Sequence, residues 1–155
     1  MITAPSTSSD RTFTIRVYGL LIRQGEVLVA DELIRGQRIT KFPGGGLEYG
    51  EGLRDCLIRE IREEVGVEAK DLRHFYTPDF FQQSGFHSRP MQVISVYYTF
   101  TVDGAERIPV VQHPFQGMAE GCEQELFRWV RLEGDAAAVL SLPIDRHVWE
   151  LLLKA

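Results

Sequence analysis

Residues 45–67, GGLEYGEGLRDCLIREIREEVGV, join a glycine-rich turn to an amphipathic segment. From about Gly52 to Val65 an apolar side chain recurs every four residues, which predicts a helix with one buried face. Gly66 follows this segment and is typical of a residue that ends a helix. The stretch therefore predicts a turn that leads directly into a helix.

One side of the predicted helix carries a cluster of acidic residues. Glu60, Glu63 and Glu64 are neighbours on the helix surface, where like charges destabilise a helix by about 0.2–0.5 kcal/mol per pair. Arg59 can neutralise one of these carboxylates but not all of them. The cluster is either a solvated acidic face or a site for a divalent cation. The adjoining glycines favour the cation site, because they let a backbone carbonyl approach a ligand beside the carboxylates, and such oxygen ligands suit Mg²⁺ or Mn²⁺.

The spacing of these residues resembles the Nudix box, the pattern GX5EX7REUXEEXGU in which U is an aliphatic residue. Every defining position is filled, by Gly45, Glu51, Arg59, Glu60, Ile61, Glu63, Glu64, Gly66 and Val67. The preceding FPGG and the later FRWV with a predicted C-terminal helix are also similar to the usual flanks of the box. The likeness to the Nudix hydrolase family therefore extends over most of residues 12–154.

The resemblance implies a fold and an activity. The fold is of the α/β class (α+β), an α/β/α sandwich of helices around a mixed central β-sheet. The activity is that of a metal-dependent pyrophosphohydrolase, in which water attacks phosphorus and cleaves a nucleoside diphosphate linked to another moiety. The sequence does not decide among several candidate substrates: a nucleoside triphosphate, ADP-ribose, a dinucleoside polyphosphate, a nucleotide sugar and an oxidised deoxynucleoside triphosphate.

The resemblance also implies the residues of the site, with Mg²⁺, or alternatively Mn²⁺, as the cofactor. The metal-binding positions of the family correspond here to Glu60, Glu63, Glu64 and, through its carbonyl, Gly44. Glu51 and Arg59 correspond to supporting residues of catalysis, of which Arg59 orients the acidic cluster. Glu60 is the first candidate for the general base that accepts a proton from the attacking water.

One departure and two alternatives bear on this interpretation. Thr40 stands where many members have tryptophan, two residues before the phenylalanine or leucine of the PGG turn, which argues against an enzyme that reads oxidised purines. One alternative is a nucleotide-sensing module without catalysis, but such modules have degenerate boxes and this box is intact. The other is an enzyme similar to isopentenyl-diphosphate isomerase, which requires additional His and Glu ligands and a catalytic cysteine in a longer chain.

The acidic loop 117–125 is a weaker candidate region. It holds Glu120, Glu123 and Glu125, which are either solvated loop charges or a source of one further catalytic group. Glu123 is the first candidate there for an extra base or metal ligand.

Two further groups could contact the substrate. Arg35, Arg38 and Lys41 precede the glycine turn and are either phosphate-binding residues or ordinary surface charges. The aromatic residues of 75–86, FYTPDFFQQSGF, either stack on a base or pack in the core, and core packing is the expectation.

The rest of the chain predicts a β-rich domain. Strands are expected where β-branched and aromatic residues concentrate, and a short helix where Pro143 introduces a last apolar pattern. The expected strands are 12–22, 27–30, 67–76, 91–102 and 126–132, and the expected helix is 144–153. Residues 31–41 are polar and basic and are predicted to form a loop. We therefore expect one domain over residues 12–155 after a disordered polar tail, residues 1–11.

Composition limits the partners. The formal net charge of −5 argues against a dedicated nucleic-acid surface, since phosphate backbones require a basic footprint, and favours a small nucleotide. The sequence has no apolar run of membrane-spanning length, and its start lacks the features of a signal peptide. Cys56 and Cys122 provide no disulfide framework. We expect a cytoplasmic protein without membrane contact and, by family analogy, a homodimer.

Overall fold

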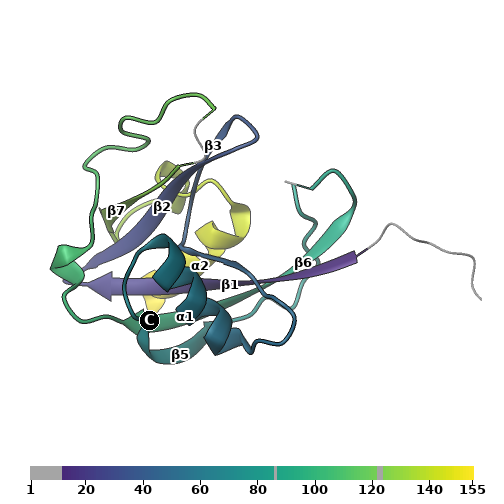
Figure 1. The fold of residues 1–155 in the computed structure, drawn as a ribbon. Coiled ribbons are helices and arrows are strands. Elements are labelled where there is room, and N and C mark those ends of the chain that lie inside the picture. The colour runs from purple at the N-terminus through teal and green to yellow at the C-terminus, as the bar shows by residue number, and fades with distance from the viewer. Residues whose placement is uncertain (1–11, 86, 122–123) are drawn as a thin grey trace, which may run out of the picture.

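The computed structural model describes residues 12–85, 87–121 and 124–155 (Figure 1). The predicted tail, residues 1–11, lies outside these ranges. The strands are β1 (Thr12–Arg23), β2 (Glu26–Ile34), β3 (Gln37–Lys41), β4 (Gly44–Gly46), β5 (Lys70–Tyr76), β6 (Met91–Thr101) and β7 (Glu125–Arg131). The helices are α1 (Leu53–Glu64) and α2 (Pro143–Lys154), with short 3-10 turns at Ala105–Arg107 and Ala136–Ala138.

The strands form one mixed sheet. Its order is β3-β2-β1-β6-β5, while β4 pairs with β1 and β7 pairs with β2. β1 and β6 run parallel, in register from Thr12 opposite Met91 to Leu21 opposite Phe100, and the other pairings are antiparallel. β1 therefore lies at the centre and carries the glycine turn on its edge.

The two helices cover opposite faces of this sheet (Figure 1). Successive residues of a strand point to opposite faces, so each central strand contributes to two cores. Val17 of β1 packs in the core beneath α1, whereas its neighbour Tyr18 packs in the core beneath α2. Val96 and Tyr97 of β6 divide in the same way. The predicted sandwich of helices around a mixed sheet is confirmed.

The prediction that residues 31–41 form a loop is wrong. β2 continues to Ile34 and β3 returns over Gln37–Lys41, joined by the two-residue turn Arg35-Gly36. Both turn residues have positive φ, +48° and +76°, which is the backbone of a primed hairpin turn that matches the twist of the strands. Polar residues are tolerated in these strands because they are paired. The Asp31 carboxylate, for example, accepts hydrogen bonds from the Arg128 guanidinium at 2.8 and 3.2 Å.

The other expected elements are present, with shifted ends. The strand expected over 67–76 begins only at Lys70, and the glycine turn contains the short strand β4. Phe80 and Phe81 are 50% and 68% exposed, so core packing is wrong for these two residues of the 75–86 segment. Neither helix, nor any other in the described ranges, has the length and apolar character that crossing a membrane requires.

Candidate active site

The glutamates of helix α1 lie on different faces of the helix. Leu57 and Ile61 are fully buried against the sheet and fix the rotation of the helix. Glu60 and Glu64, one helical turn apart, line a cleft of about 640 Å³. Glu63 is 59% exposed and does not line that cleft. The structure therefore brings two of the three predicted glutamates to one cavity.

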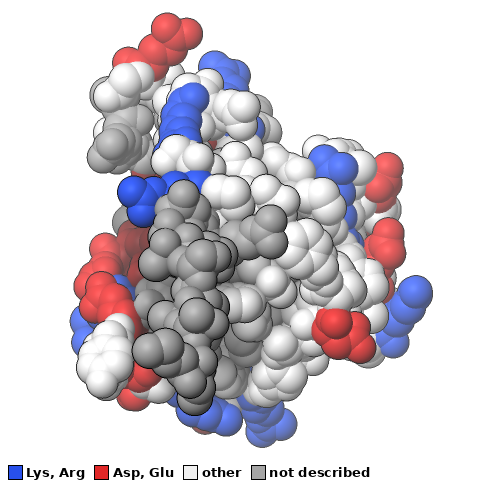
Figure 2. Space-filling model, turned by 90° about the vertical axis from the view of Figure 1, so that its right-hand side faces the viewer, with Lys and Arg blue, Asp and Glu red and all other residues white. Residues whose placement is uncertain are grey.

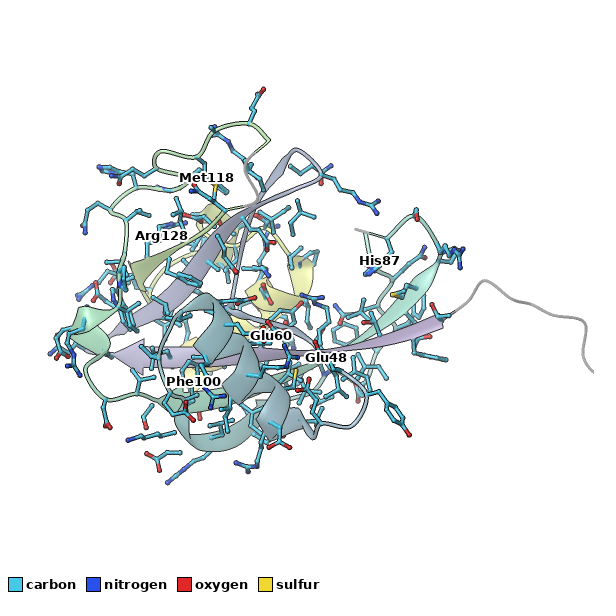
Figure 3. All side chains as sticks on the ribbon, in the orientation of Figure 1. Glu48, Glu60, His87, Phe100, Met118 and Arg128 are labelled. Carbon is cyan, nitrogen blue, oxygen red and sulfur yellow. The ribbon has the colours of Figure 1, made fainter. Side chains whose placement is uncertain are left out.

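The cleft is built from several elements that are far apart in the sequence. Its walls are formed by α1, the glycine turn, β1, β2, β3, β6 with the loop before it, and the start of α2. Figure 3 shows Glu60 on α1 and His87 in the loop before β6, and both residues line the cleft. A mixed wall of this kind suits a ligand that is partly apolar and partly charged.

Arg59 holds the acidic residues in place. Its Nε and Nη2 donate to both carboxylate oxygens of Glu51, at 2.9 and 2.7 Å. Its Nη1 donates to Glu60 at 2.9 Å and to Glu63 at 3.3 Å, and Nη2 also donates to the Gly46 carbonyl at 3.1 Å. The hydrogen bonds from Arg59 lower the pKa of Glu51 to about 2. The predicted orienting role of Arg59 is consistent with this hub.

At two consecutive positions of the glycine turn, the neighbouring atoms leave no room for a side chain. Gly44 has φ +145°, and a Cβ there would overlap the Val17 carbonyl of β1. A Cβ at Gly45 would overlap the carboxylate of Glu60. Gly44 thus lets the turn pair with β1, and Gly45 leaves room for the Glu60 carboxylate.

Glu64 and Glu125 form a partly buried acidic pair at the edge of this site. Each has one carboxylate oxygen, Oε2 of Glu64 and Oε1 of Glu125, without a hydrogen-bond partner among the described residues. Burial and the charge of the other carboxylate raise the pKa of Glu64. Burial also raises the pKa of Glu125, although Lys41 at 3.9 Å opposes this. Two neighbouring carboxylates that repel each other and have oxygens without hydrogen-bond partners are suited to share a cation.

The residues fit a hard divalent cation by their chemistry. Glu60 and Glu64 line the same cleft as the Gly44 backbone, and the unpartnered oxygens of the acidic pair add donors of the type Mg²⁺ prefers. In the described ranges, no three His, Cys, Asp or Glu side chains already stand in a metal-holding arrangement. Arg59 donates to one oxygen of Glu60, Oε1, and the remaining lone pairs of this carboxylate can still bind a cation.

The basic residues named as phosphate-binding candidates lie in different places. Lys41 is buried, lines the cleft and pairs with Glu32 at 3.0 Å. Arg35 and Arg38 are exposed on the β2–β3 hairpin and do not line the cleft, and Arg38 stacks over the ring of Phe115. The structure therefore brings only one of the three to the cavity.

The acidic loop 117–125 and Arg16 are the remaining residues for which the structure can be compared with the predictions from the sequence. Glu123 lies outside the described residues, and Glu120 is exposed. Glu125, named with them but not preferred, is the member that reaches Glu64. Arg16 of β1, which also lines the cleft, was missed. Its only sequence signal is a charge in the middle of a mostly apolar strand.

The buried carboxyls predict a pH dependence of stability. Burial raises the pKa of Glu64, of Glu125 and of Asp145, the last to about 6. A carboxyl whose folded pKa is raised contributes stability at low pH that is lost as pH rises toward the folded pKa. We expect the free energy of unfolding of the metal-free protein to fall by on the order of 1–3 kcal/mol between about pH 5 and pH 8. Urea denaturation in chelator measures this.

The control for this prediction is Glu64→Gln, which removes one of the ionising groups and should flatten the curve. Glu51 contributes almost no slope in this window, because its folded pKa is lowered to about 2 and an unfolded glutamate is also mostly ionised above pH 5. Added Mg²⁺ should stabilise the protein more at the high end of the window, where the carboxylates are ionised. A stability that rises with pH over the same range contradicts the prediction.

Comparisons with known proteins agree with this architecture. The family model described as "NUDIX domain" matches residues 11–141. Of the solved structures, a MutT from a study of Aliivibrio salmonicida and Vibrio cholerae aligns with TM-score 0.64 and 21% identity, covering 92% of this chain and 98% of that one. A MutT NUDIX hydrolase from Burkholderia pseudomallei aligns with TM-score 0.63 and 17% identity, covering 89% and 96%. At these identities the structures support the fold.

Sequence relatives match over a shorter stretch. RNA pyrophosphohydrolase of Cronobacter sakazakii is 43% identical over 51 residues, and that of Yersinia enterocolitica is 47% identical over 51 residues. Each match covers 33% of this chain and 28% of the relative, so the chain spans little more than a quarter of these proteins. The family match, by contrast, covers most of the chain and includes every residue of the box. The chain belongs to the NUDIX domain family.

Proposed function

We propose that this chain is a Nudix pyrophosphohydrolase that cleaves a nucleoside diphosphate linked to another moiety. The observation that carries the proposal is the pair Glu60 and Glu64, which the structure places beside the glycine turn in one cleft. The names of the relatives, pyrophosphohydrolase and MutT NUDIX hydrolase, support the same reaction class.

In this proposal the residues of the box divide the work. Glu60 accepts a proton from the attacking water, because its carboxylate lies in the cleft and can reach a water there. Arg59 orients Glu60, and Glu51 in turn anchors Arg59 through two hydrogen bonds. Glu60, Glu63, Glu64 and the Gly44 carbonyl are the proposed metal ligands, with Glu125 as an addition that the structure suggests.

NUDIX hydrolases generally use divalent metal ions, and we propose Mg²⁺ or Mn²⁺ here because the donors are all oxygen. A bound divalent cation would neutralise phosphate oxygens and acidify a bound water.

We propose a small nucleotide as the substrate. A cleft of about 640 Å³ is in the range of sites that enclose a small molecule. On the face shown in Figure 2, basic and acidic residues are interspersed. The net charge of −5 also disfavours a long nucleic-acid footprint. Because the sequence relatives are named RNA pyrophosphohydrolases, a triphosphorylated RNA belongs in the substrate panel. A cytoplasmic location and a homodimer stay predictions from the sequence.

The alternative functions are less well supported. A sensing module without catalysis would not need the Arg59 network that holds Glu60 in the cleft. An isomerase of the isopentenyl-diphosphate type requires a reactive cysteine. Cys56 is fully buried, and burial raises the pKa of its thiol to about 12, so this thiol is not reactive, while Cys122 lies outside the described residues.

A substrate panel with Mg²⁺ tests the function. It contains a nucleoside triphosphate, an oxidised deoxynucleoside triphosphate, ADP-ribose, a dinucleoside polyphosphate, a nucleotide sugar and a 5′-triphosphorylated RNA, with released phosphate and pyrophosphate as the readout. We expect one class to be hydrolysed and its turnover to disappear after metal removal and chelation. Undiminished turnover in excess chelator would exclude metal dependence, and no turnover of any member would exclude the proposed activity.

A further inference from the structure

The cleft contains an arginine that forms no ion pair with an acidic side chain of the described residues. Arg16 lies in β1, opposite Gly46 in the β1–β4 pairing, and its side chain lines the cleft. Its Nε donates to the Tyr18 hydroxyl at 2.8 Å. Among the described residues, no Asp or Glu forms an ion pair with its guanidinium, although the charges of Glu60 and Glu32 act on it from further away.

The other cation of the cleft differs in this respect. The ammonium of Lys41 lies 3.0 Å from Glu32 and 3.9 Å from Glu125, so its charge is matched within the protein. A cation removed from water without a partner is unfavourable unless a ligand supplies the opposite charge. Of the arginine and lysine side chains among the described residues that line the cleft, Arg16 is therefore the one available to an anion.

The position of Arg16 is set by a rigid support. Tyr18 is 5% exposed, and its ring stacks on Tyr97 with centroids 5.2 Å apart. The hydroxyl of Tyr97 in turn donates to the buried carboxylate of Asp145 at 2.6 Å. Because both tyrosines are packed between the sheet and α2, the hydroxyl that receives Arg16 Nε has little freedom. With Nε engaged, the two Nη groups are left for a ligand.

We propose that Arg16 binds a phosphate of the substrate and that Tyr18 positions it. The inference rests on the proposed function, which requires a phosphate chain to lie beside Glu60. The cleft has carboxylates on its α1 side and Arg16 on its β1 side. A diphosphate that lies between them is attracted by the positive charge of Arg16. A guanidinium is suited to this task because its planar N–H groups match two phosphate oxygens at once.

The test is calorimetric binding of inorganic pyrophosphate in the presence of Mg²⁺, which requires no hydrolysis. We expect Arg16→Gln to weaken the affinity roughly 10- to 100-fold, as for the loss of charge-assisted hydrogen bonds. Tyr18→Phe, which removes only the supporting hydroxyl, should show a smaller loss. Arg16→Lys should bind pyrophosphate more tightly than Arg16→Gln, because lysine restores the positive charge but not the planar pair of N–H groups of arginine. With a substrate from the panel, Arg16→Gln should raise KM.

The matched control is Arg73→Gln, which removes one positive charge from an exposed position of β5 that does not line the cleft. Its affinity for pyrophosphate should stay within about two-fold of wild type. Mn²⁺ affinity, measured by electron paramagnetic resonance without pyrophosphate, should not fall in Arg16→Gln or Tyr18→Phe, which separates anion binding from damage to the acidic cluster. Melting curves check that each variant is folded, and Tyr18→Phe serves if Arg16→Gln does not fold.

Pyrophosphate affinity that is equal in wild type and Arg16→Gln would overturn the proposal. So would an equal loss in Arg16→Gln and Arg73→Gln, or a wild-type protein that binds no pyrophosphate. Failure of the proposed function has a different signature. A chain that hydrolyses nothing in the panel, yet binds pyrophosphate through Arg16, would refute the hydrolase and keep the anion site.

Discussion

Replacing Glu60 with glutamine is expected to lower kcat by a factor on the order of 10²–10⁴, the usual range for loss of a general base. Glutamine keeps the shape of the side chain and can still receive the hydrogen bond from Arg59, so the fold should be retained. Saturating Mg²⁺ should restore little of the rate, because metal occupancy is not what is missing. Steady-state kinetics over a Mg²⁺ titration measure both quantities.

The neighbouring glutamates provide the controls. Glu64→Gln should lower both metal affinity and rate, and excess Mg²⁺ should recover part of the loss. Glu63→Gln should have a weaker effect than Glu64→Gln, since Glu63 is exposed and outside the cleft. Glu123→Gln tests the loop before β7, and Glu125→Gln tests the first residue of β7. If either loses much more kcat than Glu60→Gln at saturating metal, the base lies there and our assignment of Glu60 is wrong.

Gly45→Ala is expected to lower kcat nearly as much as Glu60→Gln, by on the order of 10²-fold, because misplacement of a catalytic group by about 1 Å has costs of this size. The added Cβ would overlap the Glu60 carboxylate, which is the movable end of a side chain. The carboxylate can turn away, so the protein should fold with little loss of stability. Kinetics combined with a melting curve would show activity lost without the fold.

The adjacent glycines are matched controls for this substitution. At Gly46 an added Cβ would meet only the Arg16 Nη1, at 3.9 Å, so Gly46→Ala should not displace Glu60. At Gly44 the Cβ would overlap backbone of β1, and φ is +145°, so Gly44→Ala should be strongly destabilised. Equal activity in Gly45→Ala and Gly46→Ala would show that contact with Gly45 does not hold Glu60 in place.

The β2–β3 hairpin shows where prediction from the sequence failed. The polar character of residues 31–41 indicated a loop, yet Asp31 and Arg128 meet from positions 97 residues apart. No local pattern reveals such a partner, and without it a buried aspartate argues against a strand. A usable signal was nevertheless present, because Arg35-Gly36 has the same residue-glycine form as Gln24-Gly25, the turn between β1 and β2.

The cleft shows a second limit. Arg16 is a charged residue in the middle of a mostly apolar strand that also ends in Arg23, and nothing near it in the sequence marks it as a site residue. It reaches the cleft because β1 pairs with β4 in a register that sets Arg16 opposite Gly46, beside the turn below Glu60. Register is a property of two strands, so one strand alone cannot predict it.

The sequence by itself determined α1, the turn before it and the neighbourhood of Glu60, Glu63 and Glu64, because spacing within one helix sets which side chains are adjacent. It also placed Arg59 within reach of that cluster. Only the tertiary structure decided that Glu64 faces the cleft while Glu63 faces solvent, since the rotation of a helix is set by the sheet it packs on. The contact of Glu64 with Glu125 likewise depends on strand pairing, which brings together residues that the chain keeps far apart.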